Sequence, residues 1–131
     1  AVLLANFMAI LIIITSVLGS SRNEMAAVHL LKMYCLPTLL YACEIWSSNL
    51  VDLHRLNVVW NNCFRNIFNC CWRESVSSLL FYTNTLPLSH LIDERKLIFL
   101  NKLHCSNNTL LRVLARYAHC EYMSLASKFN I

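Results

Sequence analysis

Glycine is almost missing from this chain: it occurs once in 131 residues, and proline occurs only twice. Barrels and sandwiches of many short strands depend on turn residues of this kind, so the composition excludes them. Charged residues make up 14% of the chain and apolar residues 57%. Such a chain has enough apolar surface to offset the entropy lost on ordering, which excludes disorder as its main state.

The chain also lacks paired metal-binding cysteines. Its seven cysteines are odd in number and include no CxxC step, which argues against a disulfide framework. Cys63, Cys70 and Cys71 with His54 could supply four ligands, but zinc sites usually use close ligand pairs on a turn, whereas Cys63 and Cys70 would share a helix face with bulky aromatic residues between them. We therefore expect buried free thiols in a reducing compartment, and neither a metal site nor a cofactor in this chain.

Apolar residues recur at helical spacing along most of the sequence, and no segment shows the sustained alternation of a strand. We predict an all-α fold of five or six helices, either a small helical domain or a fragment of something larger. Beyond an apolar segment at residues 1–18, the predicted helices cover residues 22–46, 50–71, 76–82, 89–104 and 109–129.

Local signals place the ends of these helices. Asn23 or Ser21 is expected to cap the first run, and the break at Ser106-Asn107-Asn108 to cap the last. Pro37 should end or kink the first run near Cys35, because its ring clashes with the preceding turn. The helix over residues 89–104 is expected to bury an inner stripe that includes Phe99.

Residues 1–18 contain no charge. A helix of this length reaches about 27 Å, which is just enough to cross the hydrocarbon core of a bilayer. Two interpretations remain open: a membrane-spanning segment, or a buried helix whose partners lie upstream. The first residue is Ala rather than Met, so we expect the true start to lie further upstream.

Three segments carry distinctive residue patterns. Residues 22–46 contain a Leu-Pro-x-Leu-Leu-Tyr core followed by Glu-x-Trp, residues 60–75 read WNNCFRNIFNCCWRES, and residues 84–96 read NTLPLSHLIDERK. In this order and separation they resemble the C-terminal, post-palm part of reverse transcriptases from LINE-type (non-LTR) retrotransposons. The resemblance implies a thumb-like helical region at residues 22–104. Beyond it the resemblance thins, and the helical pattern predicts a C-terminal extension at residues 105–131.

The resemblance does not imply that this chain polymerises. Such enzymes hold two divalent metals on an aromatic-x-Asp-Asp motif, and that motif does not occur here. We therefore predict no catalytic residue in this chain and expect the palm and fingers upstream. The function implied is that of a non-catalytic fragment of an RNA-directed DNA polymerase, holding an RNA–DNA or RNA template-primer duplex in the cytoplasm or nucleus. The alternatives are a small helical protein anchored in a membrane by residues 1–18, or a retroelement remnant without function.

A surface that grips a duplex uses Lys and Arg for phosphates, with amide or aromatic side chains for sugars and bases. The candidates for nucleic-acid contact are Lys32, Asn61, Asn62, Arg65, Arg73, Arg95, Lys96 and Lys102. An ordinary solvated face is the alternative, because the net charge of +4 is modest and no dense basic run is present.

Overall fold

The computed structural model describes residues 5, 8–10, 12–13, 16, 23–41, 43 and 50–129. Over these residues every regular element is helical and no strand occurs, which confirms the all-α prediction. The elements are α2 (Glu24–Leu30), η1 (Leu31–Cys35), α3 (Leu36–Leu39), α4 (Leu50–Ile67), α5 (Ser77–Tyr82), α6 (Leu88–His104), α7 (Thr109–Tyr117) and α8 (His119–Lys128).

The helices are more numerous than the five or six expected: the described residues from Glu24 onward form seven α-helices and one π-helical turn. The run around Pro37 is divided by a change of helix type. The predicted final helix over residues 109–129 was wrong as a single element, because α7 ends at Tyr117 and α8 begins after Ala118.

Pro37 changes the type of helix without ending it. The π-helical turn η1 immediately precedes α3, and the Leu36 N–H reaches back five residues to the Leu31 carbonyl. The Thr38 hydroxyl donates to the Tyr34 carbonyl at 2.9 Å. A wider turn and a side-chain donor thus accommodate a proline, which has no N–H and would crowd the carbonyl four residues earlier.

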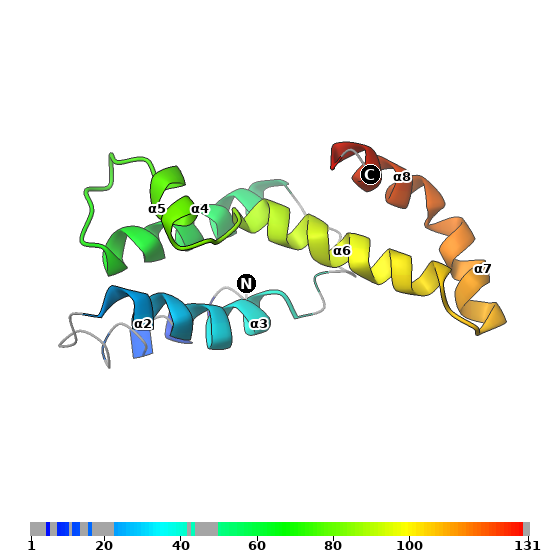
Figure 1. Ribbon diagram of the computed structural model, residues 1–131, viewed down its shortest axis with the longest axis horizontal. Helices are drawn as coiled ribbons and strands as arrows, with labels where there is room; N and C mark the ends of the chain where they lie inside the picture. The colour runs from blue at the N-terminus through cyan, green and yellow to red at the C-terminus, as the bar shows by residue number, and fades with distance from the viewer. Residues whose placement is uncertain are drawn as a thin grey trace.

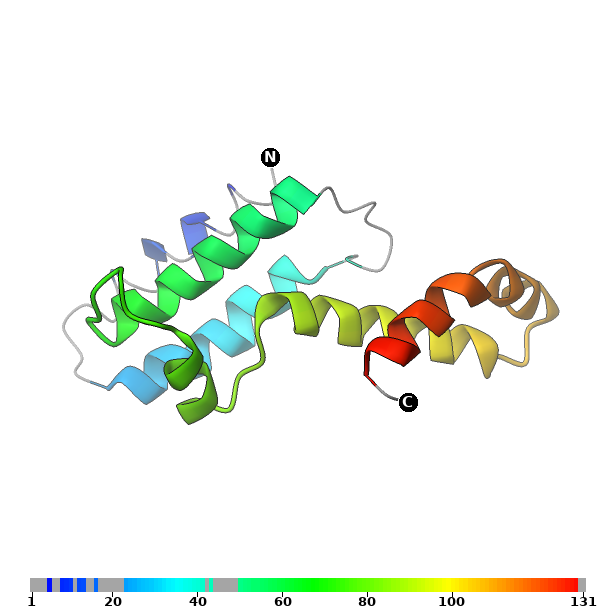
Figure 2. The same ribbon diagram turned by 90° about the horizontal axis from the view of Figure 1, so that it is seen from above.

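The helices form two regions, a body and an arm. In the body, α4 runs antiparallel to the α2–η1–α3 path, with α5 and the start of α6 beside them (Figures 1 and 2). Trp60 and Phe64 are fully buried at its centre, with their rings edge to face at 5.3 Å. The buried cluster extends along the chain from Val28 to Ile92, so it ends inside α6.

Asparagine takes the left-handed position after two helices, α4 and α5, in a chain with one glycine. Asn69 follows α4 at φ 57° and Asn84 follows α5 at φ 50°. After α4, the Cys70 N–H bonds to the Arg65 carbonyl at 2.8 Å and the Asn69 N–H to the Asn66 carbonyl at 3.4 Å. This is a Schellman motif, which needs a left-handed residue that Asn tolerates better than most.

Asparagine also begins two helices, as predicted. The Asn23 side chain accepts a hydrogen bond from the Ala26 N–H, at the start of α2. The Asn108 side chain accepts one from the Leu110 N–H at 2.9 Å, at the start of α7. The first cap is one of the two residues predicted for that position, and the second lies in the segment predicted to cap the last helix.

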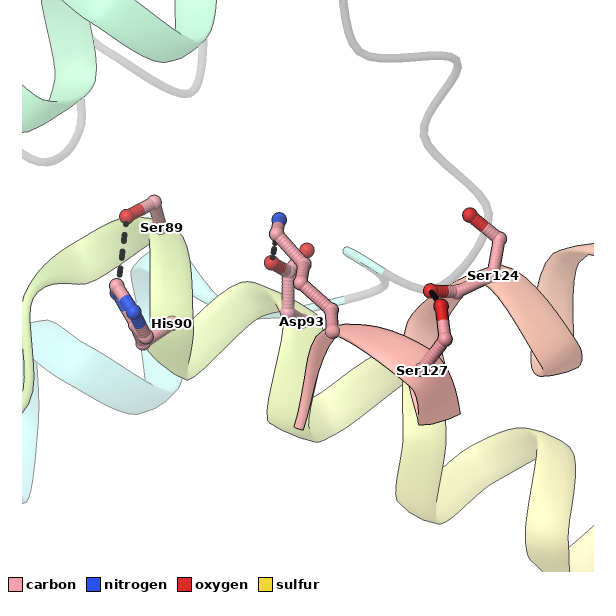
Figure 3. Close-up of polar contacts among 6 residues, drawn as sticks. Ser89, His90, Asp93, Ser124 and Ser127 are labelled. Carbon is pink, nitrogen blue, oxygen red and sulfur yellow. Dashed lines mark hydrogen bonds and ion pairs between the residues drawn. The ribbon is translucent and has the colours of Figure 1, made fainter. Parts of the chain in front are cut away.

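The arm consists of the rest of α6 with α7 and α8, and it extends from the body so that α7 lies at the far end of the molecule (Figures 1 and 2). The chain then turns back, and α8 lies along α6. Lys128 forms an ion pair with Asp93, and the His90 and Phe129 rings meet at 6.2 Å. Figure 3 shows Asp93 of α6 facing the end of α8. This return explains the break at Ala118, since one straight helix could not reach Asp93.

Most of residues 1–18 lies outside the described residues. Those that are described, including Ile12 and Ile13, are helical, and both isoleucines are exposed. Ile10 packs partly against the core of the body. Among the helices that the structure describes, none is both long and apolar enough to cross a membrane.

Candidate nucleic-acid interface

Arg95, Phe99 and Lys102 form a row on α6. They stand four and three residues apart, which places them on one face of the helix. Both basic residues are exposed, and Phe99 keeps 41% of its surface exposed. The prediction that Phe99 belongs to the buried stripe was therefore wrong. In the arm α6 buries Leu100 instead, where its partners are α7 and α8.

The α6 row lies in the cationic part of the molecule. Residues 95–131 contain six Lys and Arg against one Glu, whereas residues 1–94 contain five against six Asp and Glu. The net charge of +4 therefore comes entirely from the arm. A phosphate-rich partner is attracted toward a surface of this sign.

A second group of candidates lies where α4 ends. The Schellman motif at Asn69 turns the chain back, so that the following loop runs beside the last turns of α4. Arg65 joins the two: its Nε donates to the Glu74 carbonyl at 3.1 Å, and its Nη1 donates to Asn62 Oδ1 at 2.9 Å. Arg65 and Asn62 thus hold the loop in place, which occupies part of their hydrogen-bonding capacity.

The loop held in this way presents Trp72 and Arg73 to solvent. Trp72 is 73% exposed, and the Arg73 guanidinium carbon lies 4.9 Å from the centre of its ring. The guanidinium lies over one face of the ring, so the pair combines an exposed aromatic side chain with a positive charge. Proteins hold bases and phosphates of nucleic acids with this combination.

Lys32 is engaged within the protein. Its Nζ donates to the Thr83 carbonyl at 2.8 Å and to the Asn84 carbonyl at 3.2 Å. These carbonyls follow α5, at the negative end of the helix dipole, where a cation is stabilised. Lys32 therefore ties η1 to the end of α5.

The predicted residues do not converge on one surface. Asn61, Asn62, Arg65 and Arg73 belong to α4 and its following loop, while Arg95, Lys96 and Lys102 belong to α6. The α4–α5 loop lies at one end of the molecule and α6 extends toward the other (Figure 1). Asn61 and Lys96 are half-buried. The structure thus offers two patches, the α6 row and the Trp72–Arg73 loop.

The cysteines divide by burial. Cys35, Cys43 and Cys63 are buried in the body, while Cys71, Cys105 and Cys120 are exposed. Burial raises the pKa of Cys35 to about 11 and that of Cys63 to about 12, with the neighbouring Cys35 adding to the effect on Cys63. Across the described part of the chain, no group of three or more Cys, His, Asp or Glu side chains is arranged to hold a metal ion.

Phe99 is the residue of this candidate interface that the sequence analysis did not propose as a nucleic-acid contact. Its spacing from Leu88, Leu91 and Ile92 assigns it to the same buried stripe, and that stripe holds only as long as α6 stays beside the body. A signal was nevertheless present, because Arg95 lies four residues before Phe99 and Lys102 three residues after it.

Comparisons of the chain with protein-family models, with curated proteins and with solved structures found no match.

Proposed function

We propose that this chain is the thumb and post-palm part of an RNA-directed DNA polymerase from a non-LTR retrotransposon, and that it holds template-primer nucleic acid without carrying out polymerase chemistry. The three segments that resemble this family motivate the proposal. An all-helical body is compatible with it, and the cationic arm supplies a surface for an anionic duplex.

The α6 row is the observation that carries the proposal. Lys102 stands seven positions after Arg95, which corresponds to about 10 Å along the helix axis. That distance spans about three nucleotide steps of one strand. Two phosphates on the same strand can therefore meet the two cations, while the Phe99 ring lies between them and can contact a sugar or base.

The Trp72–Arg73 loop would contact the same nucleic acid at a second place, away from the α6 row. Arg73 supplies a further phosphate contact and Trp72 a stacking surface. Contacts of this kind position a duplex without reading its sequence. We expect binding that is indifferent to sequence and steeply dependent on salt, because each phosphate contact releases condensed counterions.

The test is fluorescence anisotropy of the full chain with a labelled RNA–DNA hybrid over a salt series. The double variant Arg95→Ala, Lys102→Ala is expected to lower affinity about tenfold and to reduce the magnitude of the log–log salt slope by about 2. Arg73→Ala should reduce the slope by about 1. Arg65 is left unchanged, because its guanidinium holds the loop.

The matched control is Arg112→Ala, Arg116→Ala, which removes the same charge from another helix of the arm. It should retain most of the affinity. An equal loss in both double variants would mean that net charge alone attracts the hybrid, and a folded chain that binds it without salt dependence would contradict the proposal.

A further inference from the structure

One face of α7 is apolar and largely exposed. Leu110, Val113, Leu114 and Tyr117 follow the i, i+3, i+4, i+7 spacing of a single helix face. Leu110 is 74% exposed and Tyr117 84%, and the other two are also exposed. The buried residue of α7 is Ala115, on a different side of the helix.

Contacts elsewhere on α7 hold the helix so that its apolar face points to solvent. The Asn108 side chain caps the helix at its start, and Ala115 is fully buried. Because α7 forms the far end of the arm (Figures 1 and 2), the body does not lie in front of it. A flat surface larger than the protein can therefore approach the helix from the end.

The charges near α7 are mostly positive, and the nearest acidic residue along the chain is Glu121 in the first turn of α8. Residues 95–120 contain five Lys and Arg and no Asp or Glu. Arg116 follows Val113 by three positions, so it flanks the apolar face, and Arg112 lies one turn before Arg116. Both arginines are exposed. A short helix with an exposed apolar face, arginines on its remaining surface and an aromatic residue at one end has the composition of a helix that lies in a membrane interface.

We propose that α7 binds the surface of an anionic lipid bilayer. Leu110, Val113, Leu114 and Tyr117 insert at the boundary between headgroups and acyl chains, and Arg112 and Arg116 contact lipid phosphates. This site is separate from residues 1–18 and does not cross the bilayer. A second copy of the chain is a poorer partner, because two cationic arms repel each other. Nucleic acid is also a poorer partner, because its charged backbone would not bury four adjacent apolar side chains.

The test is co-sedimentation of the full chain with vesicles. We expect binding to phosphatidylcholine mixed with phosphatidylserine, and much weaker binding to phosphatidylcholine alone. Leu110→Gln, Leu114→Gln should reduce binding to the anionic vesicles at least about tenfold. Arg112→Gln, Arg116→Gln should also reduce it, by several-fold. The four substituted side chains, of Leu110, Leu114, Arg112 and Arg116, are exposed. Circular dichroism checks that the variants keep their helix content.

The matched control is Phe81→Gln. Phe81 is 88% exposed on α5 of the body, so it reports general adhesion of exposed apolar residues, and it should bind vesicles as the unmodified chain does. Equal loss in Phe81→Gln, or unchanged binding in both α7 variants, would overturn the proposal. So would self-association that requires Leu110 and Leu114 in a chain that does not bind vesicles, since the apolar face would then belong to a dimer.

Discussion

The body and the arm contrast in both packing and charge. The body encloses a continuous cluster with Trp60 and Phe64 at its centre, and its sequence is close to electrically neutral. The arm is cationic. Among the residues whose burial the structure describes, the buried apolar ones outside that cluster are Ala27 and, in the arm, Leu100, Ala115, Leu125 and Ala126. The contrast indicates that the body supplies most of the folding free energy, while the arm presents surfaces for partners.

A pair of matched leucine substitutions gives the largest test of this contrast. Leu39→Ala removes a fully buried side chain of the body and is expected to cost about 3–5 kcal/mol of unfolding free energy, because the packed surroundings cannot close the cavity. Leu125→Ala, in the arm, should leave the main unfolding transition nearly in place and speed hydrogen exchange in α8 alone. Urea denaturation and hydrogen exchange measure the two effects, and equal shifts of the main transition would show that body and arm unfold as one unit.

The buried thiols predict how the stability of the body depends on pH. In the folded protein the pKa is about 11 for Cys35 and about 12 for Cys63, against an ordinary value of 9.0. Folding therefore favours the protonated thiols, and their contribution is fully present below pH 9 and is lost as the pH rises toward the folded values. The slope is up to about 1.4 kcal/mol per pH unit for each thiol.

Denaturation of variants between pH 9 and pH 11 isolates this effect from other groups that titrate there. Cys63→Ala should flatten the decline in unfolding free energy, by about 2 kcal/mol over that interval. Cys105→Ala, at an exposed thiol of the arm, should leave the decline unchanged. The same slope in all three proteins would contradict the assignment to buried thiols.

Substitution of two lysines, one in the body and one in the arm, is expected to give the smallest differences in unfolding free energy. Lys32→Met removes the contacts from its Nζ to two carbonyls after α5 and should cost about 1.5 kcal/mol, because these bonds are charged and partly buried. Lys128→Met removes the ion pair with Asp93, in which the lysine side chain is 61% exposed, and should cost less than about 1 kcal/mol. Thermal or urea unfolding measures both, and a larger cost at Lys128 would show that α8 stabilises the whole fold.

Several features of the fold follow from local sequence. Asn23 and Asn108 cap helices where predicted, since a cap depends on a side chain and a backbone N–H within one turn. The predicted disturbance at Pro37 occurs at the junction of η1 and α3, because proline acts on its own preceding turn. The helix over 89–104 differs from α6 by one residue at its start.

The candidate site was less predictable. Sequence spacing assigned Phe99 to a buried stripe, but the partners of α6 change along its length. Charge alone made Lys32 a candidate for phosphate contact, while the fold brings the carbonyls of Thr83 and Asn84 to its Nζ from a distant part of the chain. Nothing in the local sequence marks Ala118 as a break, because it carries neither glycine nor proline.

The amino-acid sequence by itself determined that this chain is helical, where several of its helices begin, and that its charge is positive, because these depend on neighbouring residues and on composition. The tertiary structure decided which faces of those helices are covered. It folded α8 back onto α6, left the apolar face of α7 exposed at the end of the arm, and separated the predicted basic residues into two patches. These outcomes depend on contacts between residues far apart in the chain, which no local pattern encodes.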